Sequence, residues 1–136
     1  MGTQGRDPAY PAICAQINSA FEIRDLIEYI GWHPAKLVRN GEIYMAMCPI
    51  HRETLFRTLV LNPRNNTYVC KHGGCPGSIP ADFLDLLIRV KGKSLPEVIE
   101  EAIDHFGADY FRLSPAHETM IRKLAAEARL RGTEPS

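Results

Sequence analysis

Apolar residues recur at the three- and four-residue spacing of amphipathic helices in five stretches of the chain. The clearest stretch is residues 21–30, where four large aliphatic side chains share one face and Gly31 ends the pattern. From this spacing, and from the serine and proline residues that precede some stretches, we predict five helices. They cover residues 11–19, 21–30, 78–91, 94–106 and the chain from residue 115 onwards.

Three of these helices carry further signals. Ser94 and Glu97 form a capping box with a proline in the first turn, because each side chain can bond the other residue's backbone amide. Ser78 and Pro80 are expected to open the helix that runs to residue 91. The last helix carries a narrow apolar stripe, which we expect to pack on its own domain; docking to a partner helix is the alternative. Its members are Ile121, Leu124, Ala125 and Ala128.

Between residues 36 and 70 the pattern changes to the short runs that are typical of β-strands. Four strands are expected, paired as two hairpins, over residues 36–39, 42–47, 56–62 and 67–70. We predict the first turn at Asn40 and Gly41, because this pair readily adopts the positive φ angles of a tight hairpin. The second turn is predicted over residues 63–66, where proline and asparagine gather. The first hairpin leads into Cys48 and the second into Cys70.

Three cysteines and a histidine form two closely spaced pairs at the ends of these hairpins. Two residues separate Cys48 from His51, four separate Cys70 from Cys75, and 18 lie between the pairs. Three thiolates and one imidazole make a closed tetrahedral zinc site, which is the structural kind. His72 is a competing ligand, but its separation from Cys70 by one residue is cramped for two bonds to one ion. The alternatives are ordinary buried thiols or a catalytic zinc ion with water as one ligand.

The composition fits a small single domain. The chain has 136 residues, of which 45% are hydrophobic, and a zinc ion would help to stabilise a section too short to bury much core. We find no apolar run long enough to cross a bilayer and no signal peptide, so we expect a cytoplasmic protein. Cys14 is far in sequence from the other three cysteines, so we expect a packed thiol rather than a disulfide.

Charge is unevenly distributed, although the formal net charge of the chain is zero. Between Gly31 and Leu95, nine Lys or Arg residues stand against four Asp or Glu residues, a net charge of +5. A basic middle section indicates a polyanionic partner, and the alternative is a chance imbalance in a short window. Placement at the carboxyl end of a predicted helix explains Arg89, Lys91 and Lys93 without a ligand.

The order of these parts resembles the zinc-binding domain of bacterial DnaG-type DNA primases. The matching stretches are residues 23–30, Cys48-Pro49-Ile50-His51, Glu53, Tyr68-Val69-Cys70, Cys75, Asp82-Phe83-Leu84 and residues 95–102. The resemblance implies an α+β fold, with a zinc ribbon on a small antiparallel β-sheet flanked by amino- and carboxy-terminal helices. We accordingly expect a flexible tail over residues 1–10, a primase-like zinc-ribbon domain over 11–112, and a carboxy-terminal helix and tail over 113–136.

Two segments depart from the family pattern. The family usually has two residues between its second pair of cysteines, where this chain has four. The family's Lys-Thr-Pro-Ser-Phe segment after the histidine is replaced here by Thr54-Leu55-Phe56-Arg57-Thr58. The second change leaves the zinc ligands intact but alters a segment beside the expected ion, so the contacts with nucleic acid are expected to differ from those of the family.

By this resemblance, the domain would bind one structural zinc ion, recognise single-stranded template DNA and help a separate polymerising domain to begin an RNA primer. Cations along the phosphates and flat side chains under the bases hold single strands. The candidates are Tyr44, Phe56, Arg57, Arg64, Tyr68, Lys71 and His72. For the two tyrosines and Phe56, the alternative role is to fill the small core beside the metal.

A second hypothesis is a stand-alone zinc-ribbon adaptor that binds a protein partner and has lost DNA binding. The altered segment after His51 and the overall neutrality of the chain favour it. In either case no catalytic Ser-His-Asp set or phosphate-binding glycine loop is visible in the sequence. We therefore do not expect the chain to be a catalyst alone; its expected partners are DNA and a polymerising domain or another replication protein.

Overall fold

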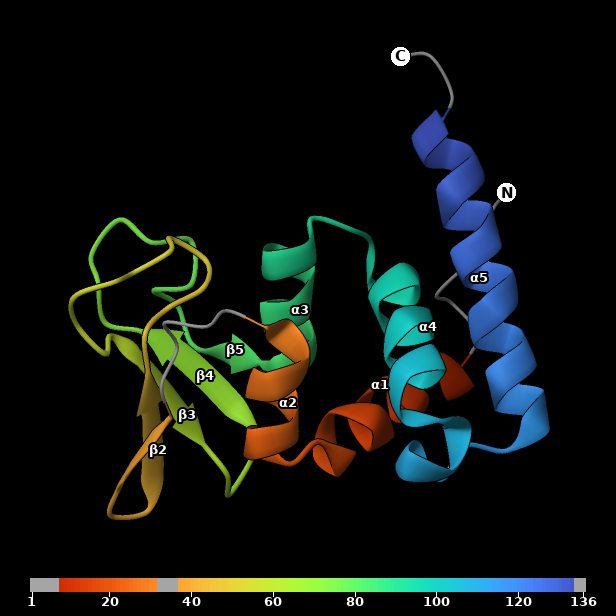
Figure 1. The fold of residues 1–136 in the computed structure, drawn as a ribbon. Helices are drawn as coiled ribbons and strands as arrows, with labels where there is room; N and C mark the ends of the chain where they lie inside the picture. The colour runs from red at the N-terminus through yellow and green to blue at the C-terminus, as the bar shows by residue number, and fades with distance from the viewer. Residues whose placement is uncertain (1–7, 32–36, 134–136) are drawn as a thin grey trace. The chain divides into compact units, whose positions relative to one another are not determined.

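The computed structural model describes residues 8–31 and 37–133, and Figure 1 draws the chain as a ribbon. The chain divides into two compact units. Among the described residues, one unit lies within residues 21–92 and contains the β-sheet; the other combines residues 8–20 with residues 93–133. None of the helices in the described part of the chain combines the length and the apolar character that a membrane span needs.

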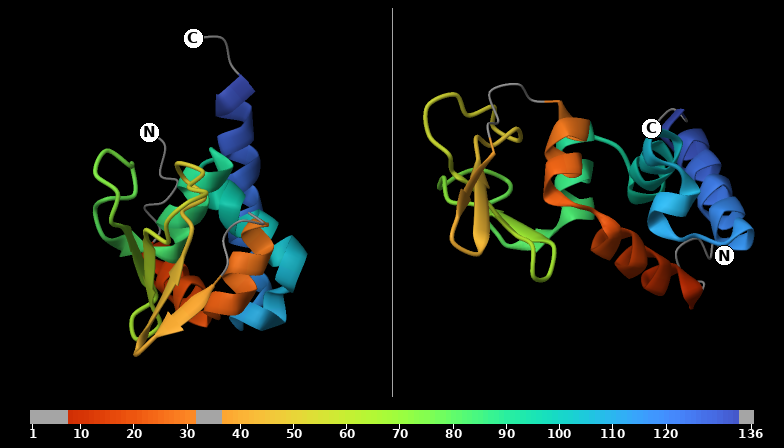
Figure 2. Two further views of the ribbon diagram at one scale, coloured as in Figure 1. Left: turned by 60° about the vertical axis from the view of Figure 1, so that its left-hand side comes forward. Right: turned by 60° about the horizontal axis from the view of Figure 1, so that its bottom comes forward.

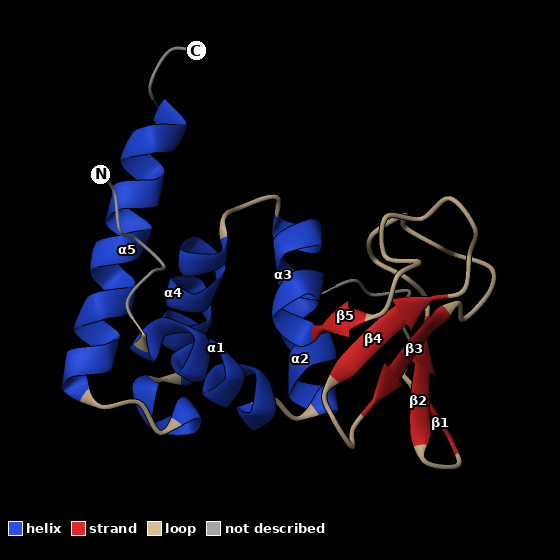
Figure 3. Cartoon of the chain, turned by 180° about the vertical axis from the view of Figure 1, so that it is seen from behind, coloured by secondary structure: helices blue, strands red, loops and turns tan. Residues whose placement is uncertain are grey.

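The unit of residues 21–92 is built on a five-stranded antiparallel sheet (Figure 3). Its strands are β1 Val38–Asn40, β2 Ile43–Ala46, β3 Leu59–Asn62, β4 Thr67–Cys70 and β5 Ala81–Asp82. They lie in chain order, so each strand pairs with the next one along the chain. Two helices belong to the same unit, α2 Ile23–Ile30 and α3 Phe83–Lys91. Together with the helices at both ends of the chain, this sheet confirms the expected α+β class.

The core of this unit lies between the sheet and its two helices. In β3, buried and half-buried residues alternate, and Leu59 and Leu61 are the buried ones. Helices α2 and α3 lie side by side next to the sheet in the views of Figures 1 and 2. The hydroxyl of Tyr68 on β4 donates to the carboxylate of Asp85 on α3, at 2.6 Å, which fastens the sheet to that helix.

The turn of the first hairpin differs from the prediction. Its register pairs Asn40 with Ile43, so the two turn residues are Gly41 and Glu42 rather than Asn40 and Gly41. Of these, only Gly41 has a positive φ, +66°, and one glycine at the first turn position is sufficient for a two-residue hairpin. The second hairpin turns through residues 63–66, as predicted, although β3 begins at residue 59 rather than 56.

The start of α3 also differs from the prediction. Ser78 and Pro80 do not open a helix, because the next two residues form β5 and pair with β4. The helix begins after that pairing, and Asp82 caps it by accepting a hydrogen bond from the backbone amide of Asp85, at 2.9 Å. The sequence before residue 83 carries a helix-start signal, but pairing with a distant strand prevails.

The described part of the other unit is helical. Its elements are α1 Ala9–Ala20, α4 Leu95–Phe106, the short 3₁₀ helix η1 Ala108–Phe111, and α5 Pro115–Thr133. The apolar stripe of α5 is buried and α5 packs on α4, which confirms that the stripe serves this unit's own core. The predicted capping box of Ser94 and Glu97 is present at the start of α4.

Some sequence predictions are not tested by this structure. Residues 1–7 of the expected tail, and Lys36 at the start of the first expected strand, lie outside the described residues. The expected boundaries at residues 11–112 and 113–136 stay predictions.

Candidate metal centre and nucleic-acid interface

The sheet topology brings the two cysteine pairs to one end of the sheet. Strands β2 and β4 both pair antiparallel with β3, so they run in the same direction and end on the same side. Ala46, Leu59 and Cys70 are neighbours across these three strands. Cys48 follows the end of β2 by two residues, and Cys70 is the last residue of β4. Ligands from separate hairpins therefore meet without a long connection.

The four expected ligands lie at distances that suit one tetrahedral ion. Their ligand atoms are all within 4.8 Å of one another and belong to Cys48, His51, Cys70 and Cys75. The Sγ atoms of Cys48 and Cys75 are 3.9 Å apart, and Cys70 Sγ lies 3.6 Å from His51 Nδ1. A tetrahedron with ordinary zinc bond lengths has S–S and S–N edges of about 3.8 and 3.6 Å. Both the donor set and its spacing therefore fit zinc.

The surroundings of the cysteines are suited to a cation. Burial raises the pKa of the Cys48 thiol to about 12 and also raises the pKa of Cys75, so without a metal both side chains favour the neutral thiol. A zinc ion reverses this preference, because it binds the thiolate form. The backbone amide of Gly77 donates to Cys75 Sγ at 3.4 Å, and the hydroxyl of Thr58 lies 3.4 Å from Cys70 Sγ. The Gly77 amide would stabilise Cys75 as a thiolate, and the Thr58 hydroxyl, which accepts from the Cys70 thiol here, could turn to donate to a Cys70 thiolate.

His51 is oriented by Glu53. Its Nδ1 faces Cys70, and its Nε2 lies 3.0 Å from one carboxylate oxygen of Glu53, to which the Nε2–H donates. The other carboxylate oxygen accepts hydrogen bonds from the backbone amides of Leu55, at 2.9 Å, and Phe56, at 3.2 Å. The bond from His51, followed by those two amides, lowers the pKa of Glu53 to about 2. A carboxylate behind a metal-binding imidazole fixes its tautomer and its direction.

The competing ligand, His72, lies outside the cluster of three sulfurs. Its side chain is exposed and its ring stacks on that of His51, with 4.6 Å between ring centroids. Cys75 is the residue that completes the Cys-His-Cys-Cys cluster. Cys14 lies half-buried on α1, and none of the four cysteines, all of which the structure describes, forms a disulfide.

The family model described as the CHC2 zinc finger, the zinc ribbon of DnaG-type primases, matches residues 9–118. The chain belongs to the CHC2 zinc-finger family. No curated protein and no solved structure gives a significant match. Family membership, together with the Cys-His-Cys-Cys cluster, indicates one structural zinc ion.

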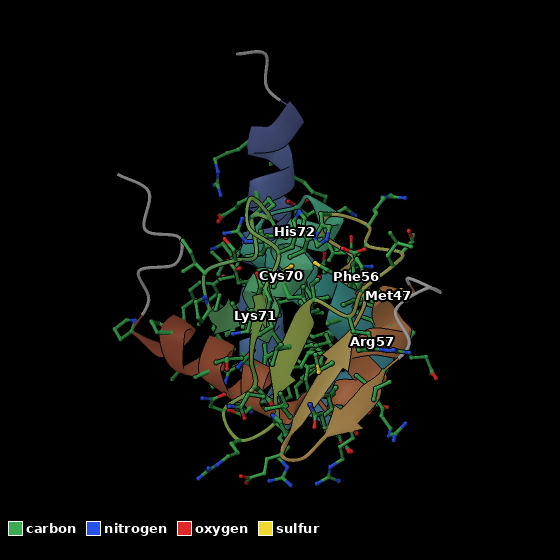
Figure 4. The ribbon with its side chains drawn as sticks, turned by 90° about the vertical axis from the view of Figure 1, so that its left-hand side faces the viewer. Met47, Phe56, Arg57, Cys70, Lys71 and His72 are labelled. Carbon is green, nitrogen blue, oxygen red and sulfur yellow. The ribbon has the colours of Figure 1, made fainter. Side chains whose placement is uncertain are left out.

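Four of the candidate DNA-binding side chains of this CHC2 zinc finger are exposed near the metal centre. They are Phe56, Arg57, Lys71 and His72. The backbone amide of Lys71 donates to the carbonyl of Thr58 at 2.7 Å, so the segment after His51 and the segment after β4 are direct neighbours. Figure 4 shows Phe56 and Arg57 on one flank of Cys70, with Lys71 and His72 beside it.

The other three candidates are placed elsewhere. Arg64 is exposed in the turn between β3 and β4, at the end of that hairpin opposite to Cys70. Tyr44 is half-buried on β2, and the guanidinium of Arg39 lies 5.7 Å from its ring centroid. Tyr68 is only 1% exposed, and burial raises its pKa above the ordinary value. Tyr68 therefore takes the core role that the sequence left open, and its ring is not accessible to a base.

Two relevant residues were not singled out as site residues from the sequence. Leu55 is 75% exposed beside Phe56, and Glu53 connects His51 to the backbone of this segment. No sequence pattern marks Leu55 as exposed, since Phe56 beside it falls in the predicted strand over residues 56–62. The role of Glu53 depends on three hydrogen bonds that no sequence pattern specifies.

Proposed function

We propose that this CHC2 zinc finger binds single-stranded DNA and serves as the template-recognition module of a DNA primase in DNA replication. One observation carries the proposal: an exposed aromatic ring and cationic side chains lie together beside the metal centre. Phe56 is 67% exposed, and Arg57, Lys71 and His72 are exposed in the same or the adjoining segment. Such a combination holds single strands, because rings stack on bases and cations neutralise phosphates.

The local charge supports the same partner. Between His51 and Cys75 the chain has four Lys or Arg residues and one acid. That acid is Glu53, whose carboxylate is already bonded to His51 and to two backbone amides. The excess of basic residues makes this segment positively charged, which attracts phosphate groups.

In this proposal the zinc ion has a structural role. Cys48, His51, Cys70 and Cys75 are its ligands, and four protein ligands leave no position for water or substrate. The ion supplies the positive charge that keeps three thiolates together and fixes the segments around them. Primer synthesis then belongs to a separate polymerising domain, which we propose as the partner of this module.

Titration of a fluorescently labelled single-stranded oligonucleotide with the zinc-loaded protein, at several salt concentrations, tests the proposal. We expect an affinity that falls steeply with salt, and a log–log slope that Arg57→Ala reduces by about 0.7. Phe56→Ala is expected to weaken binding by roughly tenfold or more, through loss of stacking. Arg64→Ala removes an exposed arginine at the other end of the hairpin and is the matched control. Failure to bind even at low salt contradicts the proposal.

A specific observation favours a second function, a zinc-ribbon adaptor that binds a protein. Leu55 and Phe56 are adjacent and are 75% and 67% exposed, and a pair of exposed apolar side chains suits a protein surface as well as bases. The adaptor would be supported if the protein binds a polymerising domain but no DNA. That protein–protein binding should be insensitive to salt and should be weakened by Leu55→Ala.

A further inference from the structure

Glu53 connects the metal centre to the segment that carries the proposed DNA contacts. We refer to residues 54–58 as the post-histidine loop. One carboxylate oxygen of Glu53 accepts from His51 Nε2 at 3.0 Å, and the other accepts from the amides of Leu55 and Phe56 at 2.9 and 3.2 Å. The side chain of Glu53 is only 12% exposed. A single residue therefore contacts both a metal ligand and the backbone of the loop.

The chemistry of imidazole makes this contact dependent on the metal. A neutral imidazole carries one hydrogen, on either Nδ1 or Nε2. His51 Nδ1 faces Cys70 Sγ at 3.6 Å, so zinc at that nitrogen leaves the hydrogen on Nε2, where it points at Glu53. Without zinc, His51 loses its anchor at Nδ1, so the Glu53 carboxylate bonds to a donor that is held less firmly.

We propose that Glu53 is a positioning residue that couples zinc binding to the order of the post-histidine loop. Zinc orients His51, His51 fixes the Glu53 carboxylate, and the carboxylate holds the amides of Leu55 and Phe56. The metal thereby presents Phe56 and Arg57 to a ligand. The identity of that ligand as DNA rests on the proposed function, whereas the order of the loop does not.

The end of the loop is held by different contacts. The Thr58 hydroxyl lies 3.4 Å from Cys70 Sγ, and the Thr58 carbonyl accepts from the amide of Lys71 at 2.7 Å. Loss of the Glu53 carboxylate should therefore release the middle of the loop, at Leu55, Phe56 and Arg57, and leave its end in place. This local release separates coupling through Glu53 from general unfolding of the unit.

Limited digestion with trypsin measures this release, because cleavage after Arg57 requires the loop to open. The variants are Glu53→Ala and Glu53→Gln, and the matched control is Thr54→Ala, which changes an exposed neighbour in the same loop. All proteins are loaded with zinc, and their metal content is verified by elemental analysis. Cleavage after Arg64, in the turn between β3 and β4, is the internal reference.

We expect cleavage after Arg57, relative to Arg64, to be about tenfold faster in zinc-loaded Glu53→Ala than in the wild type, because two amides lose a charged acceptor. Glu53→Gln should change in the same direction, since its single carbonyl oxygen cannot serve both the imidazole and the two amides. Thr54→Ala should match the wild type. The proposal is overturned if zinc-loaded Glu53→Ala and Glu53→Gln are both cleaved after Arg57 at the wild-type rate. If Glu53→Ala does not retain zinc, the result for Glu53→Gln decides.

A spectroscopic readout distinguishes positioning from a merely structural role. In the zinc-loaded wild type, the Nε2–H proton of His51 should exchange slowly with water in ¹⁵N-edited NMR spectra, because it is bonded to Glu53. In Glu53→Ala its exchange should be fast while the zinc content is unchanged. A proton that stays protected without the carboxylate contradicts the coupling.

The DNA titration separates this inference from the proposed function. If the loop responds to zinc and to Glu53 but the wild type binds no single-stranded DNA, the proposed function fails and the coupling stands. If the wild type binds DNA and zinc-loaded Glu53→Gln binds equally well with an undisturbed loop, the coupling fails and the proposed function stands.

Discussion

Gly77 is in close contact with both halves of the metal centre. Its carbonyl accepts from the amide of Cys70 at 2.8 Å, and its own amide donates to Cys75 Sγ at 3.4 Å. An added Cβ at this position would lie 2.7 Å from the Cδ1 of Ile50 and 3.0 Å from the ring of Tyr68. A methyl group here would require the flexible end of the Ile50 side chain to move and the Tyr68 ring to shift by a few tenths of an ångström.

A methyl group at position 77 should therefore disturb the zinc site. We expect Gly77→Ala to lower the free energy of unfolding of the zinc-loaded protein by about 1 kcal/mol, the lower end of the usual cost of overpacking, because the Ile50 side chain can move, and to weaken zinc binding. Urea denaturation and competition with a chromophoric chelator measure the two effects. Gly73→Ala is the control, because an added Cβ there has no neighbour within 4 Å. Equal behaviour of the two variants would contradict this account.

Tyr68 and Phe56 illustrate how burial decides the role of an aromatic residue. Tyr68→Phe removes the hydrogen bond to Asp85 and should lower the free energy of unfolding by about 1 kcal/mol, without changing the DNA affinity of the folded protein. Phe56→Ala should do the reverse, with little loss of stability and weaker DNA binding. Thermal melts and DNA titrations on both variants check this. A DNA-binding defect in folded Tyr68→Phe would show that its ring is accessible after all.

At the scale of elements, α4 is a case in which local sequence determines the start of a helix. The Ser94 hydroxyl is 2.7 Å from Glu97 Oε1, which also accepts from the Ser94 amide at 3.2 Å. The bond with the Ser94 side chain is the main reason why the pKa of Glu97 lies below its ordinary value of 4.5. The acids that follow along α4 form ion pairs, and Glu100 accepts from both Arg122 and Arg129 on α5.

We expect Ser94→Ala to lower the free energy of unfolding by about 1 kcal/mol at neutral pH, the usual effect of losing an N-cap. A carboxylate with a lowered pKa in the folded state contributes its stability above pH 4.5 and loses it as the pH falls through the folded pKa. The difference between wild type and variant should thus shrink in acid. Urea titrations followed by helical circular dichroism measure it.

The control for this prediction is Glu101→Ala, which removes an ion pair with Lys93 whose two side chains are 47% and 32% exposed. Its removal should change the stability by only a few tenths of a kcal/mol, as is usual for exposed pairs. A difference between wild type and Ser94→Ala that stays constant down to acidic pH would show that the Glu97 carboxylate does not contribute to the cap.

At the scale of the whole molecule, the two units differ in what holds them together. The unit of residues 21–92 contains the metal centre, where three buried sulfurs lie close together. The other unit has a core of its own between α4 and α5, and its described residues contribute no ligand to the cluster. Removal of zinc should therefore affect the two units unequally.

We expect chelation to abolish hydrogen-exchange protection in strands β2 to β4, because crowded thiols without a cation cannot hold the two hairpins together. The amides of α4 and α5 should stay protected, so far-UV circular dichroism should retain much of its helical signal. Hydrogen exchange with mass-spectrometric readout, with and without chelator, tests both parts. Unchanged protection of the strands in metal-free protein would show that zinc does not stabilise this unit.

The sequence by itself predicted the Cys-His-Cys-Cys cluster, the helices α1 to α5 apart from the start of α3, and the second hairpin. Ligand chemistry, the spacing of Cys48 and His51, and the capping box of Ser94 depend on residues close together in the chain, so local pattern was sufficient for them. The family resemblance, which the match over residues 9–118 confirms, rests on the same local motifs.

The tertiary structure alone decided how those elements combine. Only the pairing of β2 and β4 with β3 brings the two cysteine pairs together. Strand β5 formed in place of a first helical turn because its residues pair with β4. The same pairing and packing buried Tyr68, exposed Phe56 and placed Glu53 between His51 and the post-histidine loop. The physical reason is that strand pairing and burial depend on residues distant in the chain, which a local pattern cannot specify.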